Sequence, residues 1–213
     1  MIIIKWFGHS FWKITTDKIS IVIDPFTDIG YNMDIDVSAD VLLSSHDHFD
    51  HNNIDLIKGN PLILKEAGKF EHGNSKFELI QVWHDKKNGK QRGKNLLMKF
   101  TVGGKTFLHC GDLGHMPSPE IIGTLKNIDV LLLPVGGIFT IDAQEAIELV
   151  KIIKPKIIFP MHYDTPALNF DLAPVDDFLK YYDNILRFNK AEIELIDDYF
   201  CSNQFTIMVL NYE

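Results

Sequence analysis

Cysteine, long apolar runs and basic charge are all scarce in this chain. Its 213 residues include two cysteines, too few for a disulfide framework or a thiolate zinc knot. No apolar run reaches the roughly 18–20 residues that span a bilayer. Lysine and arginine number 21 against 29 aspartates and glutamates, for a formal net charge of −8, whereas general nucleic-acid binding needs a basic surface. The sequence therefore argues against a disulfide scaffold, a membrane-spanning protein and a nucleic-acid binder.

The N-terminal segment also lacks the features of a secretion signal. Met1–Phe7 has no basic leading region and no small-residue cleavage site, so we interpret it as a first strand and expect a cytoplasmic protein. Cys110 lies in an apolar run and is predicted to be a small buried residue. With 46% hydrophobic and 23% charged residues, typical of globular proteins, the chain is predicted to form one domain over residues 1–213.

The first half of the chain is rich in β-branched and aromatic residues, which predict strands. The predicted strands are Ile2–Phe7, Ser10–Thr16, Ile19–Asp24, Val41–Ser45, Pro61–Leu64, Lys69–His72, Phe77–Trp83, Asn95–Val102 and Lys105–Cys110, with a polar loop over Pro25 to Asp40 and helical turns over Asn53–Lys58. The last two strands should form a hairpin, because Gly103-Gly104 between them supplies the positive φ that a two-residue turn requires.

Helices and strands alternate in the second half. The predicted helices are Pro119–Leu125, Ile141–Ile153 and Val175–Tyr182, and the predicted strands are Asp129–Leu133, Lys156–Phe159, Ile193–Ile196 and Phe205–Leu210. The chain thus begins with strands, continues with a hairpin and ends with helices that alternate with strands. This order favours two sheets packed face to face with helices outside.

The strongest chemical signal follows the predicted strand Val41–Ser45. The run His46-Asp47-His48-Phe49-Asp50-His51 places three imidazoles and two carboxylates within six residues. Imidazole and carboxylate groups bind zinc and similar divalent ions. So many titratable groups beside a buried strand are unfavourable unless a cation pairs with them, so the run predicts a metal site.

Three further residues of the metal-binding type follow predicted strands. His84 comes after Phe77–Trp83, Asp112 after the hairpin, and His162 after Lys156–Phe159. A lone histidine after a strand is more often structural than functional. Because loops at sheet edges converge to build sites, the three together with the histidine run favour a shared centre.

These residues resemble the signature of the metallo-β-lactamase superfamily, His-x-His-x-Asp-His followed later by His, Asp and His. All seven positions have a match, in His46, His48, Asp50, His51, His84, Asp112 and His162. Further blocks are similar to the ascorbate-6-phosphate lactonase-like branch, namely Trp6–Ser10, Ile23–Phe26, Gly111-Asp112, Leu133–Ala146 and Pro160–Thr165. Together the blocks span nearly the whole chain.

The resemblance implies an α+β fold, a four-layer αββα sandwich with the site between the sheet edges. It also implies two divalent ions, most favourably Zn²⁺, with Mn²⁺ or iron as alternatives. His46, His48 and His84 would hold the first ion, Asp50, His51 and His162 the second, and Asp112 would bridge both. A hydroxide between the ions would be the nucleophile, and Asp50 would steer it as the catalytic residue.

Departures from other branches narrow the predicted chemistry. His48 stands where the similar flavodiiron oxygen reductases have a glutamate, and Asn52-Asn53 stands where glyoxalase II-like proteins have a glycine pair. We therefore predict a metal-dependent hydrolase acting on a small anionic ester-like molecule, either a lactone or a phosphodiester. A di-iron oxidoreductase or a non-catalytic metal-binding protein is the alternative. A purely structural site is disfavoured, since such sites usually hold one ion with four ligands.

Several other residues have open roles at this stage. His9 either lines the pocket or orders its loop, His109 is predicted to be structural, and His115 and Tyr163 are weaker candidates for the site. Ser45 and Asp47 are candidates for orienting the imidazoles. These six remain individual predictions, without a motif of their own.

Two segments bear on the substrate and on assembly. The basic segment from Lys86 to Lys94 is either a solvated loop or a flap that meets an anionic substrate. The apolar residues Phe170, Leu172 and Ala173 are a candidate interface for a homo-oligomer, although the sequence leaves the oligomeric state open.

Overall fold

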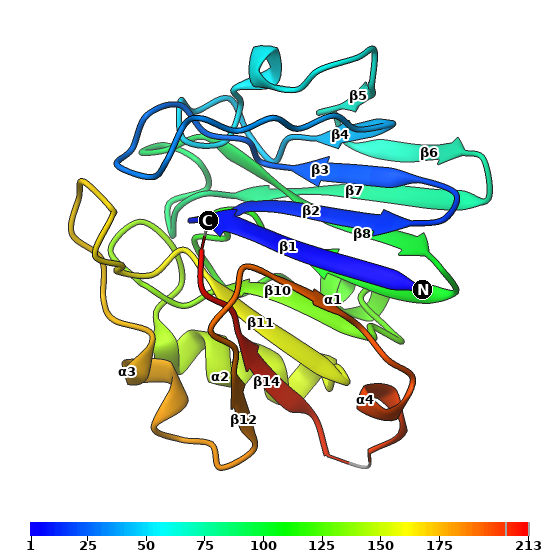
Figure 1. Cartoon of the computed structure of the whole chain (residues 1–213). Coiled ribbons are helices and arrows are strands. Elements are labelled where there is room, and N and C mark those ends of the chain that lie inside the picture. The colour runs from blue at the N-terminus through cyan, green and yellow to red at the C-terminus, as the bar shows by residue number, and fades with distance from the viewer. Residues whose placement is uncertain (203, 213) are drawn as a thin grey trace.

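The structure is a computed structural model of the whole chain, and it describes residues 1–202 and 204–212. Two sheets face one another (Figure 1). The six-stranded sheet has the order β13 (Glu192–Glu194), β1 (Ile2–Gly8), β2 (Phe11–Thr16), β3 (Ser20–Ile23), β4 (Val41–Leu43) and β5 (Leu62–Leu64). The eight-stranded sheet has the order β12 (Ile185–Arg187), β14 (Thr206–Val209), β11 (Ile157–Met161), β10 (Val130–Pro134), β9 (Lys105–His109), β8 (Lys94–Val102), β7 (Ser75–Trp83) and β6 (Gly68–His72).

Alternation along the strands of the six-stranded sheet separates two cores. In β3, Ile21 and Ile23 pack into the large core that includes the facing sheet, whereas Val22 packs into a smaller cluster on the other side. β4 divides its residues in the same way, because successive side chains of a strand point to opposite faces. The smaller cluster is completed by residues of the loop between β3 and β4, among them Phe26 and Tyr31.

Helix α2 (Ala143–Ile153) covers the outer face of the eight-stranded sheet (Figure 1). It begins at a capping box in which Asp142 accepts from the Glu145 N–H and Glu145 accepts from the Asp142 N–H. Its apolar stripe packs into the large core. The other helices are the short α1 (Pro119–Thr124), α3 (Asp176–Leu179) and α4 (Asp198–Cys201). The predicted sandwich is confirmed, with its outer layer on the six-stranded sheet built from the β3–β4 loop and the 3-10 turn η1 (Ile54–Leu56).

The predicted elements are present with small shifts of their ends, and three differences stand out. The predicted helix Val175–Tyr182 is one turn, α3, whereas β12 and α4 were not predicted. All three are three or four residues long, too short for the periodicity of side chains to define them. Cys110 is fully buried, as expected.

Parallel pairing brings the functional segments to one edge of the sandwich. β3 and β4 are parallel in one sheet, and β9, β10 and β11 are parallel in the other. β7 runs in the same direction as β9, because both are antiparallel to β8. The carboxyl ends of these strands therefore meet at the same edge, where loops can converge.

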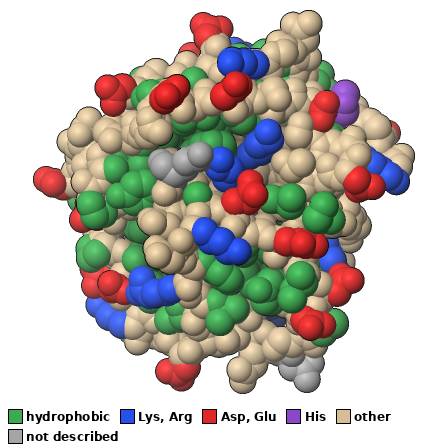
Figure 2. Space-filling model, in the orientation of Figure 1, with side chains coloured by type: hydrophobic (Ala, Val, Ile, Leu, Met, Phe, Trp, Pro, Cys, Tyr) green, Lys and Arg blue, Asp and Glu red, His purple; other side chains and the backbone are tan. Residues whose placement is uncertain are grey.

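The face of the molecule in Figure 2 has no large patch of side chains of one charge. Acidic, basic and hydrophobic side chains are interspersed there, which is typical of a globular surface. Among the described residues, no helix is long and apolar enough to cross a membrane.

Candidate metal centre

The seven predicted metal-binding residues come together in the structure. The run that contains His46, His48, Asp50 and His51 follows β4, His84 follows β7, Asp112 follows β9, and His162 follows β11. Each side chain leaves the end of a strand at the shared edge, as the parallel topology dictates.

Asp112 lies at the centre of the cluster. Its Oδ2 is 3.1 Å from Nε2 of His162 and 3.2 Å from Nε2 of His84, and its Oδ1 is 3.2 Å from Nε2 of His51. His46 is further away, with Nε2 4.0 Å from Oδ2. The side chain of Asp112 is only 2% exposed. One buried carboxylate is thus surrounded by four imidazoles that come from three parts of the chain.

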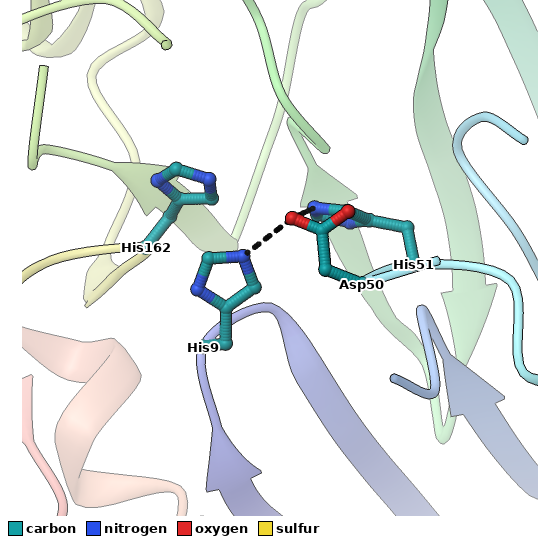
Figure 3. A group of neighbouring side chains, drawn as sticks. All are labelled: His9, Asp50, His51 and His162. Carbon is teal, nitrogen blue, oxygen red and sulfur yellow. Dashed lines mark ion pairs between the residues drawn. The ribbon is translucent and has the colours of Figure 1, made fainter. Parts of the chain in front are cut away.

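His9, Asp50, His51 and His162 form what we call the deep group. One ligand atom from each lies within 4.8 Å of the others. Figure 3 shows the four side chains converging, with the ring of His9 directed at the Asp50 carboxylate. The distance from His9 Nε2 to Asp50 Oδ2 is 3.5 Å. The three histidine side chains are at most 1% exposed, so this group is closed to solvent except at Asp50.

His46, His48 and His84 form what we call the open group, because His48 reaches solvent. Their ligand atoms also lie within 4.8 Å of one another. Nε2 of His46 and Nδ1 of His48 are 3.1 Å apart. Two ring nitrogens that face each other need a shared proton or a shared cation between them.

The donor set fits metal ions. Buried ring nitrogens and carboxylate oxygens normally have hydrogen-bond partners, yet several atoms that face the centre have none in the part of the chain described. These atoms are Nε2 of His9, Nε2 of His51 and Oδ1 of Asp112, of which the last two lie 3.2 Å apart without forming a hydrogen bond. Unpartnered imidazole and carboxylate atoms around a common point are what a divalent cation of the zinc type would satisfy.

The pKa values of the cluster also suit a cation. Burial and the neighbouring His162 lower the pKa of His9 to about 4, and burial is the main cause that lowers the pKa of His46 and His84. These rings are therefore neutral at pH 7, as metal ligation requires. Burial raises the pKa of Asp112, but His162 and His51 hold it well below its usual value.

His51 is the exception among the rings. Burial lowers its pKa, but Asp112 and Asp24 together raise it well above the usual value. Without a cation, His51 therefore carries the proton that balances the buried carboxylates. A metal ion would take the place of that proton.

Asp24 supports the centre from behind and was not predicted as an individual site residue. It is fully buried at the end of β3, and its carboxylate accepts from Nδ1 of His51 at 3.0 Å and from the Ser45 N–H and Oγ–H at 2.7 Å each. Ser45 Oγ is also 2.9 Å from Nδ1 of His46. Asp24 thus orients one ring of each group, and the predicted orienting role of Ser45 is supported.

Asn95 fixes the backbone at Asp112. Its Oδ1 accepts from the Asp112 N–H at 2.9 Å, and its Nδ2 donates to the Cys110 carbonyl at 2.9 Å. Gly111 between them has φ +51°, and a Cβ there would lie 2.3 Å from Asn95 Oδ1 and 2.5 Å from Ser45 Cβ. Only glycine allows this close approach.

Three non-glycine residues of the centre have left-handed backbone conformations. The φ angles are 48° at His9, 47° at Asp24 and 50° at His162. Such conformations are unfavourable by about 1–3 kcal/mol each and cluster at functional sites.

The other candidate residues lie elsewhere. His109 is buried, with one ring nitrogen 3.1 Å from the Ser10 carbonyl and the other accepting from the Gly111 N–H at 3.0 Å, so its predicted structural role is supported. Both ring nitrogens of His115 bond to backbone groups. Tyr163 packs in the core with its ring centroid 5.4 Å from that of Trp6. The predicted orienting role of Asp47 is not supported, since its carboxylate accepts from Asn52 and contacts no imidazole among the described residues.

The segment from Lys86 to Lys94 is ordered around one carboxylate. The oxygens of buried Asp85 accept from the backbone N–H groups of Lys87, Gly89, Gln91 and Arg92, at 2.7 to 3.0 Å. Burial opposes the charge of Asp85, but these four donors hold its pKa at about 2. The segment is therefore a fixed loop that presents Arg92 toward the metal centre.

Comparisons with known proteins agree with this centre. A sequence profile of the β-lactamase superfamily domain matches residues 3–162. A UPF0173 metal-dependent hydrolase of Desulforamulus reducens is 32% identical over 200 residues, covering 79% of this chain and 87% of that protein. One of Bacillus cereus is 30% identical over 203 residues, covering 79% and 88%.

A solved structure extends the likeness to the fold. A Thermotoga maritima protein, described as a Zn-dependent hydrolase of the metallo-β-lactamase superfamily, is 35% identical, with a TM-score of 0.84 and 100% of both chains covered. The profile match and these identities agree with the cluster of histidines around Asp112. This chain belongs to the metallo-β-lactamase superfamily, as one of its metal-dependent hydrolases.

Proposed function

We propose that the protein is a binuclear hydrolase that acts on a small anionic ester-like substrate. The open group would hold one divalent ion, and Asp50, His51 and His162 of the deep group would hold the other, with Asp112 shared between them. The observation that carries this proposal is the position of Asp112, whose two oxygens face imidazoles of both groups at 3.1 to 3.2 Å. Zinc is the ion that this donor set favours, with manganese and iron as alternatives.

When bound, the ions would supply a hydroxide nucleophile at neutral pH and polarise the scissile bond. The chain itself positions the reacting groups. Asp50 is the deep-group residue that is partly open, with its side chain 14% exposed, so its carboxylate can orient the attacking water from the pocket side. His9 lies 3.5 Å from that carboxylate and limits its movement.

The pocket above the centre has the size of a small ligand. It has a volume of about 380 Å³, and Asp50, His84 and Asp112 form its floor beside Arg92, within the usual range for small-molecule sites. The planar guanidinium of Arg92 presents a fork of N–H donors that binds carboxylates and phosphates. An anionic ester, either a lactone or a phosphodiester, therefore matches the site.

The first experiment compares two substrates with metal-loaded protein. An aryl phosphodiester and a phosphorylated sugar lactone are offered separately, and Asp50→Ala serves as the blank. Hydrolysis of either that disappears in the blank supports the proposal and selects the substrate class. No hydrolysis of either by protein with bound metal would contradict it.

The same preparation tests the redox alternative. An iron absorption band together with oxygen consumption would favour a di-iron oxidoreductase on this fold. Metal binding with neither hydrolysis nor oxygen consumption would favour a non-catalytic metal-binding protein.

A further inference from the structure

Aromatic side chains form the walls of the pocket above the metal centre. The residues that line this aromatic pocket are His48, Phe49, Asp50, His84, Arg92, Asp112, Phe139 and Phe170. Phe49 is 63% exposed, although it sits within the metal-binding run. Large apolar side chains left open beside a catalytic centre indicate a ligand surface.

The phenylalanine rings are fixed by their neighbours. The centroids of Phe139 and Phe170 are 6.1 Å apart at an interplanar angle of 74°, a favourable edge-to-face arrangement. Phe170 in turn meets the ring of His9, with centroids 5.6 Å apart at 86°. The predicted oligomer surface around Phe170 is thus in part a wall of the site.

Arg92 lies between the apolar wall of this pocket and a second, charged pocket. Its guanidinium carbon lies 5.2 Å from the centroid of Phe139, within the range of a cation–π contact. Arg92 and His48 also line a second pocket of about 320 Å³ that includes Lys65 and Lys94. Asp47 lines it too, with its carboxylate engaged by Asn52. We call this second hollow the basic pocket.

The loop architecture explains why Arg92 is the cation at the junction. The backbone at Arg92 is held by Asp85, whose Oδ2 accepts from its N–H at 2.8 Å. Gly89 in the same loop leaves no space for a side chain, since a Cβ would lie 2.5 Å from Trp83. Lys86 is directed elsewhere, with Nζ 2.6 Å from Glu145 of α2.

We propose that the substrate is an amphiphilic anion, a small phosphate or carboxylate that carries an aromatic ring. The ring would lie among Phe49, Phe139 and Phe170, and the negative charge would lie at Arg92, toward the basic pocket. This inference rests on the proposed hydrolase function of the same site, and it deepens it by naming the substrate class.

A sugar phosphate fits these walls less well. Away from the ligand residues and Arg92, the aromatic pocket offers phenyl faces, and the hydroxyl groups of a sugar would lose hydrogen bonds to water there without replacement. An aromatic ring gains apolar contact from the same walls and gives up no hydrogen bond. The walls therefore favour an aryl ester over a polyhydroxylated one.

Binding of two phosphonates to the metal-loaded protein tests the inference without turnover. Phenylphosphonate and methylphosphonate carry the same anionic head, so the ratio of their Kd values, measured by calorimetry, isolates the ring. We expect phenylphosphonate to bind about 10-fold more tightly or better. Equal affinities would overturn the proposal, whatever the protein hydrolyses.

Variants separate the two parts of the site. Phe139→Leu should reduce the phenyl-to-methyl ratio at least about 3-fold, and Arg92→Gln should weaken both phosphonates about 5- to 30-fold. Lys87→Gln, at an exposed position of the same loop, is the matched control and should change neither. An unchanged Kd in Arg92→Gln, or a change in Lys87→Gln of equal size, would overturn the assignment of the anion to Arg92.

The phosphonate binding test and the hydrolysis test can fail independently of each other. A protein that hydrolyses neither test substrate but prefers phenylphosphonate keeps the amphiphilic site and loses the hydrolase proposal. A protein that hydrolyses the phosphorylated sugar lactone and binds both phosphonates equally keeps the hydrolase and loses the aryl substrate.

Discussion

The deep group and the open group use the same residue types in opposite surroundings. His9, His51 and His162 are enclosed by the sandwich, and Asp24 fixes the rear nitrogen of His51. In the open group, His48 reaches solvent and lines both pockets. Enclosure and oriented ligands favour retention of an ion, whereas an accessible ligand favours contact with substrate. Under the proposed function, the deep group would therefore retain its ion, whereas the open group would exchange ligands with the substrate.

The largest effect should come from removing the residue that both groups share. Asp112→Ala should lower the bound metal of both groups and reduce turnover by more than the roughly 100- to 1,000-fold that loss of one catalytic hydrogen-bond donor typically causes. Metal analysis and single-substrate kinetics measure the two effects. Asp47→Ala, an exposed carboxylate between His46 and His48, is the control and should keep both ions. Full activity in Asp112→Ala would remove that residue from the site.

Asp24→Asn should reduce the contrast between the two groups, because Asp24 directly contacts His51 of the enclosed deep group. It weakens the support behind His51, and loss of such a partner typically reduces metal affinity about 10- to 100-fold. A stepwise chelator titration should therefore show one ion leaving earlier than in the unaltered protein. The expectation fails if both ions keep their original affinities.

His9→Gln tests whether His9 contributes to metal binding by the deep group. His9 Nε2 has no hydrogen-bond partner among the described residues and lies 3.5 Å from Asp50 Oδ2. We expect the affinity of the deep group for cobalt to fall about 10-fold, with a changed visible spectrum that reports the altered surroundings of the ion. His109→Gln is the control, because His109 is equally buried but bonded to backbone groups. An unchanged spectrum in His9→Gln would leave His9 as a loop-ordering residue.

The smallest effect should come from a carboxylate far from both groups. Asp40 Oδ2 accepts from the Ser20 N–H at 2.7 Å and Oγ–H at 2.8 Å, and these bonds lower its pKa below the usual value. Because the folded pKa is depressed, the stabilisation is present above about pH 4, the unfolded value, and is lost as the pH falls below it.

Asp40→Asn should therefore lower the Tm by less than about 2 °C at pH 7, and the difference should shrink as the pH falls below about 4. Thermal melts across this range measure it, and metal content should not change. A difference that grows toward low pH would contradict the assigned role of the carboxylate.

Much of the metal centre could be predicted from sequence because its ligands are adjacent to strand ends. His46, His48, Asp50 and His51 lie in one run, and the rest follow buried strands at the same edge. Parallel topology then determines that they meet. The strands themselves were predicted well, since their β-branched residues alternate between two cores.

Asp24, Asn95 and the position of His9 required the structure. Each is a single polar residue without a cluster around it, and its contacts depend on segments distant in the chain. Asp24 is 27 residues from His51, and Asn95 is 17 residues from Asp112. Pairings of this kind depend on the register between strands and loops, which residue patterns alone do not determine.

The left-handed backbone at His9, Asp24 and His162 limits how this protein can change over time. Glycine is the residue that would relax such a conformation, yet at each position glycine would delete a side chain that the centre uses. Selection for a more stable fold and selection for the centre therefore act in opposite directions at these three positions. A variant with glycine there could fold more readily and still be unable to do the chemistry, so stability screens alone would favour the wrong proteins.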